Sequence, residues 1–148
     1  MLRLELVDET TFDAVIDLSV AQQDERRLAP NVYSLAQAWL LRDTRQVFPY
    51  AILSSGKVVG FLLLNKDPKK KEYLIWRLMI DQSHQDRGYG KEAIRLVIRM
   101  AQADEKCETV VVDYVMGNHR MRGILESLGF ETDGISGNEV VMTLNVIK

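Results

Sequence analysis

Residues 85–91 have the composition of an anion-binding turn, with glycines at positions 88 and 90. Glycine has no Cβ atom, so a phosphate group can approach the backbone closely. An apolar run, residues 74–80, precedes the turn, and an amphipathic stretch, residues 91–103, follows it. The first turn of a helix presents unpaired N–H groups and a partial positive charge to an anion. The sequence therefore predicts a strand, a glycine turn (residues 85–91) and a helix start that together bind a pyrophosphate.

Length and charge limit the classes of protein to which this chain can belong. A chain of 148 residues is long enough for one domain, and a net charge of -2 gives no overall basic field for nucleic acid or an anionic membrane. Residues 1–7 lack the apolar region of a signal peptide, and no apolar run reaches the roughly 18 residues of a membrane span. Its single cysteine, Cys107, fits a reducing cytoplasm. We expect one globular domain, residues 1–148, in the cytoplasm, with no nucleic-acid or membrane partner.

Hydrophobic periodicity predicts the elements that position the glycine turn. Strands are expected at residues 2–6, 48–54, 58–65, 74–81, 109–114 and 140–146, and helices at residues 12–19, 34–41, 91–103 and 118–128. The meander in the middle predicts antiparallel strands, and the strand–helix–strand unit around the turn predicts a parallel pair. We therefore expect an α/β (α+β) fold, with a mixed, mostly antiparallel sheet and helices on both of its faces.

This order of elements, together with the Gln-x-x-Gly-x-Gly motif at residues 85–90, resembles the GNAT superfamily of acyl-CoA-dependent N-acetyltransferases. Residues 79–81 precede the motif at the family's spacing, Asn118 begins the next helix, and residues 128–130 match the glycine-phenylalanine ending of that helix. The resemblance spans nearly the whole chain. It implies a single GNAT domain with acetyl-CoA as cosubstrate.

Several further segments are similar to the bacterial spermine/spermidine (diamine) acetyltransferase branch of this family. These segments are residues 22–23, 29–31, 34–38, 76–81 and 137–142. The similarity implies a polyamine acceptor and an acetyl transfer by direct attack in a ternary complex. Family members of this kind are often dimers, which implies a homodimer here.

The resemblance also implies which residues bind the cofactor. The pyrophosphate would lie on the N–H groups of the glycine turn, with charge-assisted contacts from Arg87 and Lys91. The pantetheine arm would pair with the strand before the turn, where a backbone N–H polarises the thioester carbonyl. The residues expected to bind the cofactor are Leu78, Met79, Ile80, Gln85, Asp86, Arg87, Gly88, Tyr89, Gly90, Lys91 and Asn118.

An amine acceptor places a demand on the site, because only the free base attacks a thioester. At pH 7 only about one alkylamine molecule in a few thousand is neutral, so carboxylates are needed to attract the cation and to take its proton. Asp81 and Glu139 are the leading catalytic candidates, because both lie in branch-like segments. Trp76 is a candidate for cation–π contact with the acceptor, or alternatively a core residue. Further carboxylates that could bind the acceptor are Asp24, Glu25, Glu72 and Asp113.

One position departs from the family pattern. The helix usually carries a tyrosine four residues before the glycine of the glycine-phenylalanine pair, and this tyrosine returns a proton to the coenzyme A thiolate. Here the position is Leu125, which has no proton to donate. Water could protonate the thiolate, whose pKa is about 8.5, or Tyr114 or Tyr89 could take over. We adopt Tyr114 as the hypothesis for the general acid.

Two alternatives remain open at the level of function. The chain could acetylate another small amine or a protein amine, because acidic residues favour a cationic acceptor without fixing its length. It could also be a catalytically weak acyl-CoA-binding sensor, an interpretation that Leu125 favours. The cysteine and the two histidines do not stand at metal-ligand spacing, so no metal is expected.

Overall fold

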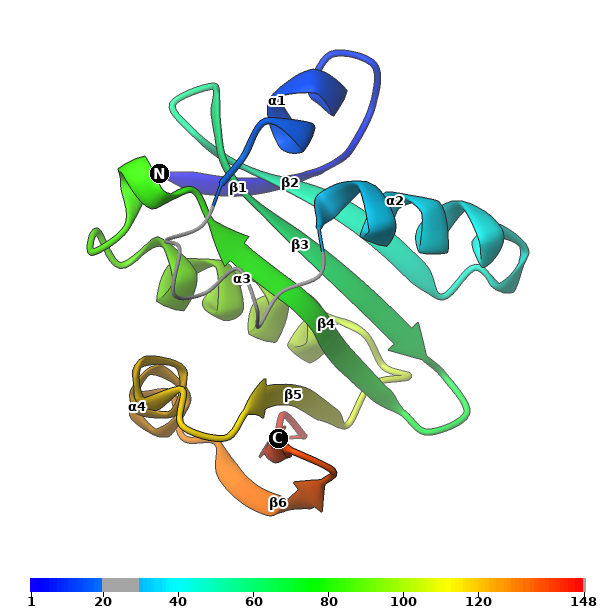
Figure 1. Cartoon of the computed structure of the whole chain (residues 1–148). Helices are drawn as coiled ribbons and strands as arrows, with labels where there is room; N and C mark the ends of the chain where they lie inside the picture. Colours follow the sequence, from blue (N-terminus) through cyan, green and yellow to red (C-terminus); the bar gives the residue numbers. More distant parts are fainter. Residues whose placement is uncertain (20–29, 148) are drawn as a thin grey trace.

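The computed structural model describes residues 1–19 and 30–147, which form one seven-stranded sheet with helices on both faces (Figure 1). The strands are β1 (Leu2–Leu6), β2 (Val47–Ser54), β3 (Lys57–Asp67), β4 (Glu72–Ile80), β5 (Thr109–Val115), β6 (Glu131–Ser136) and β7 (Glu139–Asn145). The helices are α1 (Phe12–Ile16), α2 (Asn31–Leu40), α3 (Tyr89–Ala103) and α4 (His119–Ser127), with short 3-10 turns η2 (Arg42–Thr44) and η3 (Gln82–His84). The sheet order is β1-β2-β3-β4-β5-β7-β6.

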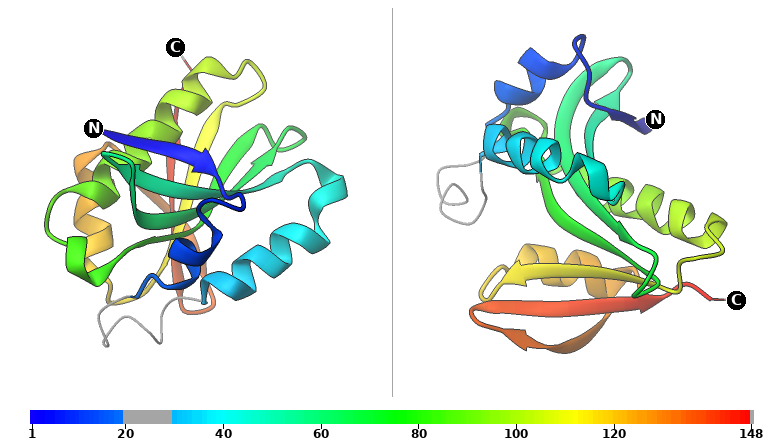
Figure 2. Two further views of the ribbon diagram at one scale, coloured as in Figure 1. Left: turned by 90° about the horizontal axis from the view of Figure 1, so that it is seen from above. Right: turned by 90° about the vertical axis from the view of Figure 1, so that its right-hand side faces the viewer.

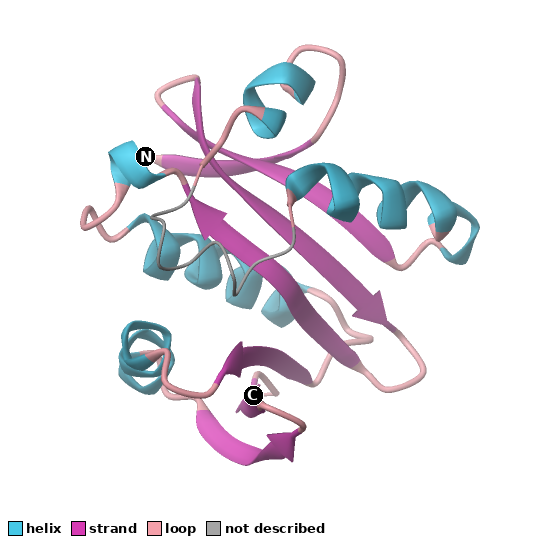
Figure 3. Ribbon diagram, in the orientation of Figure 1, coloured by secondary structure: helices cyan, strands magenta, loops and turns pink. Residues whose placement is uncertain are grey.

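The pairing of the strands confirms the predicted fold class. β2, β3 and β4 pair antiparallel, and β4 and β5, which flank α3 in the chain, pair parallel. Two apolar clusters cover the two faces of the sheet: α1 and α2 pack on one face, and α3 and α4 pack on the other (Figure 3). Among the described residues, none of the helices has the length and apolar character needed to cross a bilayer.

Besides shifts of one or two residues at other ends, one strand and two helix boundaries differ from the prediction. β6 was not predicted, because all six of its residues are exposed on the edge of the sheet and show no alternation between apolar and polar side chains. α1 ends at Ile16 instead of continuing to residue 19. α2 begins at Asn31 rather than at Ser34, because Pro30 occupies the N-cap position and Ser34 is buried within the helix.

β4 and β5 are paired over only part of their length. The register joins residues 72–75 to residues 109–112, whereas β4 continues to Ile80 and β5 to Val115. A register shift against β3 inserts Trp76 as an extra residue in β4, and such a bulge bends a strand and increases its twist. Beyond the paired segment the two strands separate, and the C-terminal part of the sheet (β5–β7 with α4) diverges from the N-terminal part (Figure 2).

Candidate active site

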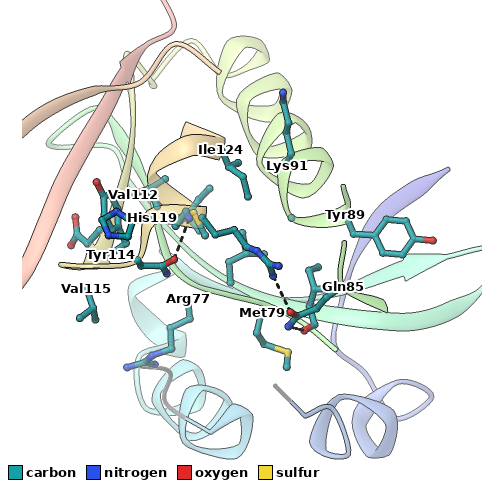
Figure 4. A pocket seen from close by; sticks show the side chains of 18 of the residues that line it. Arg77, Met79, Gln85, Tyr89, Lys91, Val112, Tyr114, Val115, His119 and Ile124 are labelled. Atoms are coloured by element: carbon teal, nitrogen blue, oxygen red, sulfur yellow. Dashed lines mark hydrogen bonds between the residues drawn. The ribbon is translucent and has the colours of Figure 1, made fainter. Parts of the chain in front are cut away.

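A cavity of about 760 Å³ lies where β4 and β5 diverge. Its walls are residues 74–80 of β4, residues 112–115 of β5, the glycine turn with the start of α3, and residues 117–121 of the turn and helix that follow β5 (Figure 4). Several of the predicted site residues line this cavity together. They are Trp76, Leu78, Met79, Ile80, Gln85, Asp86, Gly88, Tyr89, Gly90, Lys91, Tyr114, Asn118 and Glu139.

The glycine turn brings unpaired backbone donors to the cavity. Gly88 is the N-cap of α3 with φ +77°, and no side chain caps this helix. The first hydrogen bond within the helix runs from the Glu92 N–H to the Gly88 carbonyl, so the N–H groups of residues 89–91 have no partner inside α3. A Cβ atom on Gly88 or Gly90 would meet nothing within 4 Å, so no other part of the protein crowds the turn at these two positions. This geometry suits an anion at the start of α3.

Asn118 and Arg120 bring α4 to the same end of the cavity. The Asn118 side chain caps α4, because its Oδ1 accepts a hydrogen bond from the Met121 N–H at 3.2 Å. Arg120 donates to Gln85 Oε1 at 3.0 Å and to Asp86 Oδ1 at 2.7 Å. Arg120 is not among the predicted site residues; the signal in the sequence is a cation in the first turn of a helix, where it opposes the helix dipole.

Two carboxylates lie together on the opposite face of the sheet from the glycine turn. Val112 and Tyr114 belong to the cluster that packs with α3 and α4, so Asp113 between them faces the α1 and α2 side. Glu139 pairs with Val115 across β5 and β7, which makes it a diagonal neighbour of Asp113 on that face. Asp113 Oδ1 is buried and has no hydrogen-bond partner among the described residues. Burial, followed by the charge of Glu139, raises the pKa of the Asp113 carboxyl.

Arg77 and Trp76 form the part of the wall next to these carboxylates. Arg77 points toward α2 (Figure 4), where its Nη1 donates to Ser34 Oγ at 3.1 Å and also bonds Gln37. Its guanidinium lies 5.0 Å from the centre of the Trp76 ring and 5.4 Å from that of Tyr33. The Trp76 ring therefore contacts a cation that belongs to the chain itself.

The remaining predicted residues lie outside the cavity lining. Asp81 is the N-cap of η3, and its carboxylate accepts hydrogen bonds from the Ser19 and Ser83 N–H groups at 2.9 and 3.2 Å. Burial works to raise the pKa of Asp81, but the hydrogen bonds from Ser83 and Ser19 outweigh it and lower this pKa. These contacts give Asp81 a structural role, and its catalytic role stays a prediction. Glu72 starts β4 at its paired end, and Arg87 also lies outside the lining, whereas Asp24 and Glu25 fall outside the described residues.

The two tyrosines considered for proton donation differ in their orientation. Tyr114 lines the cavity and is 8% exposed. The ring of Tyr89 points away from the cavity (Figure 4), and its hydroxyl lies 3.3 Å from Ser54 Oγ of β2. Leu125, at the position of the family tyrosine, is fully buried in the core cluster between the sheet, α3 and α4. The geometry therefore favours Tyr114 over Tyr89, while the role itself stays a prediction.

In the described ranges 1–19 and 30–147, no three or more histidine, cysteine, aspartate or glutamate side chains lie close enough together to hold a metal ion. The cavity has unpaired backbone N–H groups at one end, the carboxylates of Asp113 and Glu139 at the other, and the unpaired edge of β4 between them.

Known proteins share both the sequence pattern and the fold. The spermine/spermidine N(1)-acetyltransferase of Bacillus subtilis is 22% identical over 139 residues, which cover 90% of each chain. The spermidine N-acetyltransferase of Vibrio cholerae, solved with CoA and spermine, has a TM-score of 0.78 at 11% identity, and the comparison covers 97% of this chain and 95% of that one. An aminoglycoside acetyltransferase solved with coenzyme A has a TM-score of 0.78 at 18% identity, with 98% and 95% covered.

These structural likenesses establish the fold, and the acceptors named for the two solved structures differ from each other. The family itself follows from the sequence. Residues 12–130, most of the chain, match the model of the acetyltransferase (GNAT) family. The chain therefore belongs to the GNAT acetyltransferase family and is an acetyl-CoA-dependent N-acetyltransferase.

Proposed function

We propose that this enzyme transfers the acetyl group of acetyl-CoA to a primary amine of a polyamine such as spermine or spermidine, by direct attack in a ternary complex. The observation that carries the proposal is the pair of carboxylates, Asp113 and Glu139, in the wall of the cavity on the face away from the glycine turn. A polyamine carries several positive charges along a flexible chain, so neighbouring carboxylates can bind one ammonium while another amine reacts.

Acetyl-CoA, the acetyl donor, lies along the cavity from the start of α3 to the edge of β4. The diphosphate of acetyl-CoA binds the N–H groups at the start of α3, in the open space in front of Gly88 and Gly90. The pantetheine arm adds to the unpaired edge of β4 beyond Ile75, as an extended ligand adds to a sheet edge. A backbone N–H of residues 78–80 polarises the thioester carbonyl.

An acceptor that arrives as an ammonium ion loses two protons, one before the attack and one from the attacking nitrogen as the amide forms; one proton reaches the leaving thiolate and the other passes to solvent. The amine nitrogen attacks the carbonyl carbon of the thioester, and the carbon–sulfur bond breaks. The raised pKa of Asp113 suits it to accept the ammonium proton, because a base is most effective when its pKa is nearer to the working pH. Tyr114 is proposed to donate a proton to the sulfur, and Glu139 holds the acceptor.

A panel of acceptors tests this proposal. Enzyme and acetyl-CoA are mixed with spermidine, spermine, an aminoglycoside or a short peptide with a free amino terminus, and release of free thiol is followed. We expect the highest kcat/KM with a polyamine. A higher value with the aminoglycoside or the peptide would contradict the polyamine assignment and support another amine acceptor.

A second candidate function is a catalytically weak acyl-CoA sensor. The specific observation that favours it is Leu125, which is 0% exposed and places an apolar core residue where the family has its proton donor. Measurable binding of acetyl-CoA without thiol release on any amine would establish this alternative in place of catalysis.

Two further features belong to the same proposal. The enzyme is expected to act in the cytoplasm, which agrees with a buried, free Cys107 thiol. It is expected to assemble as a homodimer, which sedimentation of the purified protein would test.

A further inference from the structure

We infer that Arg120 of α4 binds the diphosphate of the donor, and that Asp86 is the counter-ion that holds Arg120 in place while the site is empty. This inference rests on the donor half of the proposed function. It assigns a binding role to a residue outside the family motif on which the sequence analysis relied.

The position of Arg120 is the first observation. It lies in the first turn of α4, on the far side of the cavity from β4, and its guanidinium contacts the glycine turn. One Nη donates to Gln85 Oε1 at 3.0 Å and the other to Asp86 Oδ1 at 2.7 Å. A single cation thus bridges α4 and the turn in front of α3 at the open end of the cavity.

Gln85, which accepts a hydrogen bond from Arg120, is itself fixed by a second hydrogen bond. Gln85 Nε2 donates to the carbonyl of Ile80 at 3.2 Å, so the amide that receives Arg120 is itself fixed to the end of β4. Arg120 is therefore held over the glycine turn by a partner that is not charged. Pre-ordering a long side chain in the empty site reduces the entropy lost when a ligand binds.

The charge of Asp86 explains why the bridge would rearrange. Asp86 has φ +65° and places a carboxylate on the turn whose backbone N–H groups attract an anion. Its side chain is 79% exposed, and that of Arg120 is 59% exposed, so their ion pair is weak and can be exchanged. A diphosphate at the start of α3 repels Asp86 and offers Arg120 more negative charge in a geometry that a guanidinium can bind bidentately.

The expected exchange is therefore specific. When the donor binds, Arg120 keeps its hydrogen bond to Gln85, releases Asp86 and contacts a phosphate oxygen, while the Asp86 carboxylate turns to solvent. Arg120 then closes the diphosphate between α3 and α4. No covalent bond is made or broken in this exchange, and its free energy contributes to the affinity for the donor.

The test uses Arg120→Gln, Asp86→Asn and a matched control, Arg122→Gln. Arg122 is on the same helix, pairs with Glu126 at 3.3 Å and lies outside the cavity lining. Binding of CoA is measured by calorimetry at two salt concentrations. We expect Arg120→Gln to weaken CoA binding roughly 10-fold to 100-fold, the range for hydrogen bonds to charged groups, and to reduce the salt dependence. Asp86→Asn should bind CoA at least as tightly as the unaltered enzyme, and Arg122→Gln should bind it equally.

A truncated donor separates diphosphate binding from a structural role. S-acetylpantetheine lacks the diphosphate, so kcat/KM with this donor should be the same for Arg120→Gln and the unaltered enzyme. Equal losses with both donors, or a loss in Asp86→Asn as large as that in Arg120→Gln, would overturn the inference and make the pair a structural strut. If Arg120→Gln binds CoA as tightly as the unaltered enzyme, the role of Arg120 is wrong but the donor site stands. If the unaltered enzyme does not bind CoA, the donor site itself is wrong.

Discussion

Asp113 combines a cost in stability with a chemical use. Its Oδ1 is buried without a partner among the described residues, and a buried carboxylate that lacks a hydrogen bond destabilises the folded state. The neighbouring Glu139 adds repulsion, so both effects favour the neutral form of Asp113. A cationic acceptor would remove both penalties at once. This balance is consistent with the ammonium site proposed here in its empty state.

Replacing Asp113 by Asn should therefore weaken function and increase stability. We expect kcat/KM for spermidine to fall about tenfold or more, because the variant loses both a charge-assisted hydrogen bond and the proposed proton acceptor. At a pH above the folded pKa of Asp113 the variant should have the higher melting temperature, because it lacks the partly buried charge. The measurements are steady-state kinetics and thermal unfolding of the two proteins at matched concentration.

The pH dependence of this stability difference follows from the direction of the pKa shift. The folded pKa of Asp113 is above its unfolded value, so the folded state binds the proton more tightly. The destabilisation by Asp113 is thus present above the folded pKa and disappears as the pH falls to the unfolded value. The melting temperatures of the enzyme and of Asp113→Asn should converge on acidification, and a gap that widens instead would contradict the assignment.

Tyr114 presents a simpler test at the same scale. If its hydroxyl protonates the thiolate, Tyr114→Phe should lower kcat by about 10²-fold to 10⁴-fold with little change in the KM for acetyl-CoA. Rates are followed by thiol release under saturating substrates. If the activity of Tyr114→Phe stays within a factor of a few, this role is excluded. If Tyr89→Phe then shows the loss of kcat instead, the role belongs to Tyr89.

Among the elements, the start of α3 contains two glycines, Gly88 and Gly90, that differ in backbone conformation. Gly88 adopts φ +77°, which disfavours any residue with a Cβ atom. Gly90 lies inside the helix without a positive φ, and a Cβ atom there would point into open space. The backbone therefore favours a glycine at position 88, whereas at position 90 the glycine leaves open the space that is proposed for the diphosphate.

The substitution Gly90→Ala should separate folding from binding. Gly90 is in the first turn of α3 without a positive φ, and alanine forms helix more readily than glycine, so the variant should unfold at the same or a higher temperature. Its Cβ atom would occupy the diphosphate site, and CoA affinity should fall. Gly123→Ala in α4 is the matched control, because it also has open space and lies outside the cavity lining. A loss of CoA affinity in both variants would contradict the steric explanation.

An element could be predicted from the sequence when the pattern that specifies it lies within a single segment of the chain. The alternation in β1, the apolar stripe of α3 and the glycine turn each lie within one segment, and their type and order were predicted correctly. β6 has six exposed residues and forms through its pairing with β7, so its own sequence contains no burial pattern. The start of α2 was placed at Ser34 from a capping pattern, although that side chain instead accepts a hydrogen bond from Arg77 of β4.

The site residues also divide into those that a single segment specifies and those that depend on contacts between distant segments. The glycine turn could be predicted because the role proposed for it depends on the backbone and on glycines that lie within one segment. Arg120 was missed because its partners are Gln85 and Asp86, more than 30 positions earlier in the chain. Asp113 remained one carboxylate among several, since its proximity to Glu139 depends on the pairing of β5 with β7.

At the scale of the whole molecule, the cavity exists because two parts of the sheet are joined along only one end. Four residue pairs, from Glu72 with Thr109 to Ile75 with Val112, connect β4 to β5. Beyond them, the Arg120 contacts to the glycine turn bring the two parts together across the mouth of the cavity. A ligand that lies between the strands replaces the missing strand pairing and should therefore act as a mechanical link between the two parts.

Binding of CoA should accordingly stabilise the whole molecule rather than one loop. At a ligand concentration about 100 times the Kd, the expected gain is about 2.7 kcal/mol, which corresponds to a rise in melting temperature of roughly 5–10 °C for a chain of this size. Hydrogen exchange should slow in residues 76–80 of β4 and also in the first turn of α4, because the ligand contacts both. Protection confined to the glycine turn would show that CoA binds at the surface of α3 without entering the space between β4 and β5. Gly90→Ala, measured at the same CoA concentration, should lose protection in both parts together, since the link depends on the diphosphate reaching the start of α3.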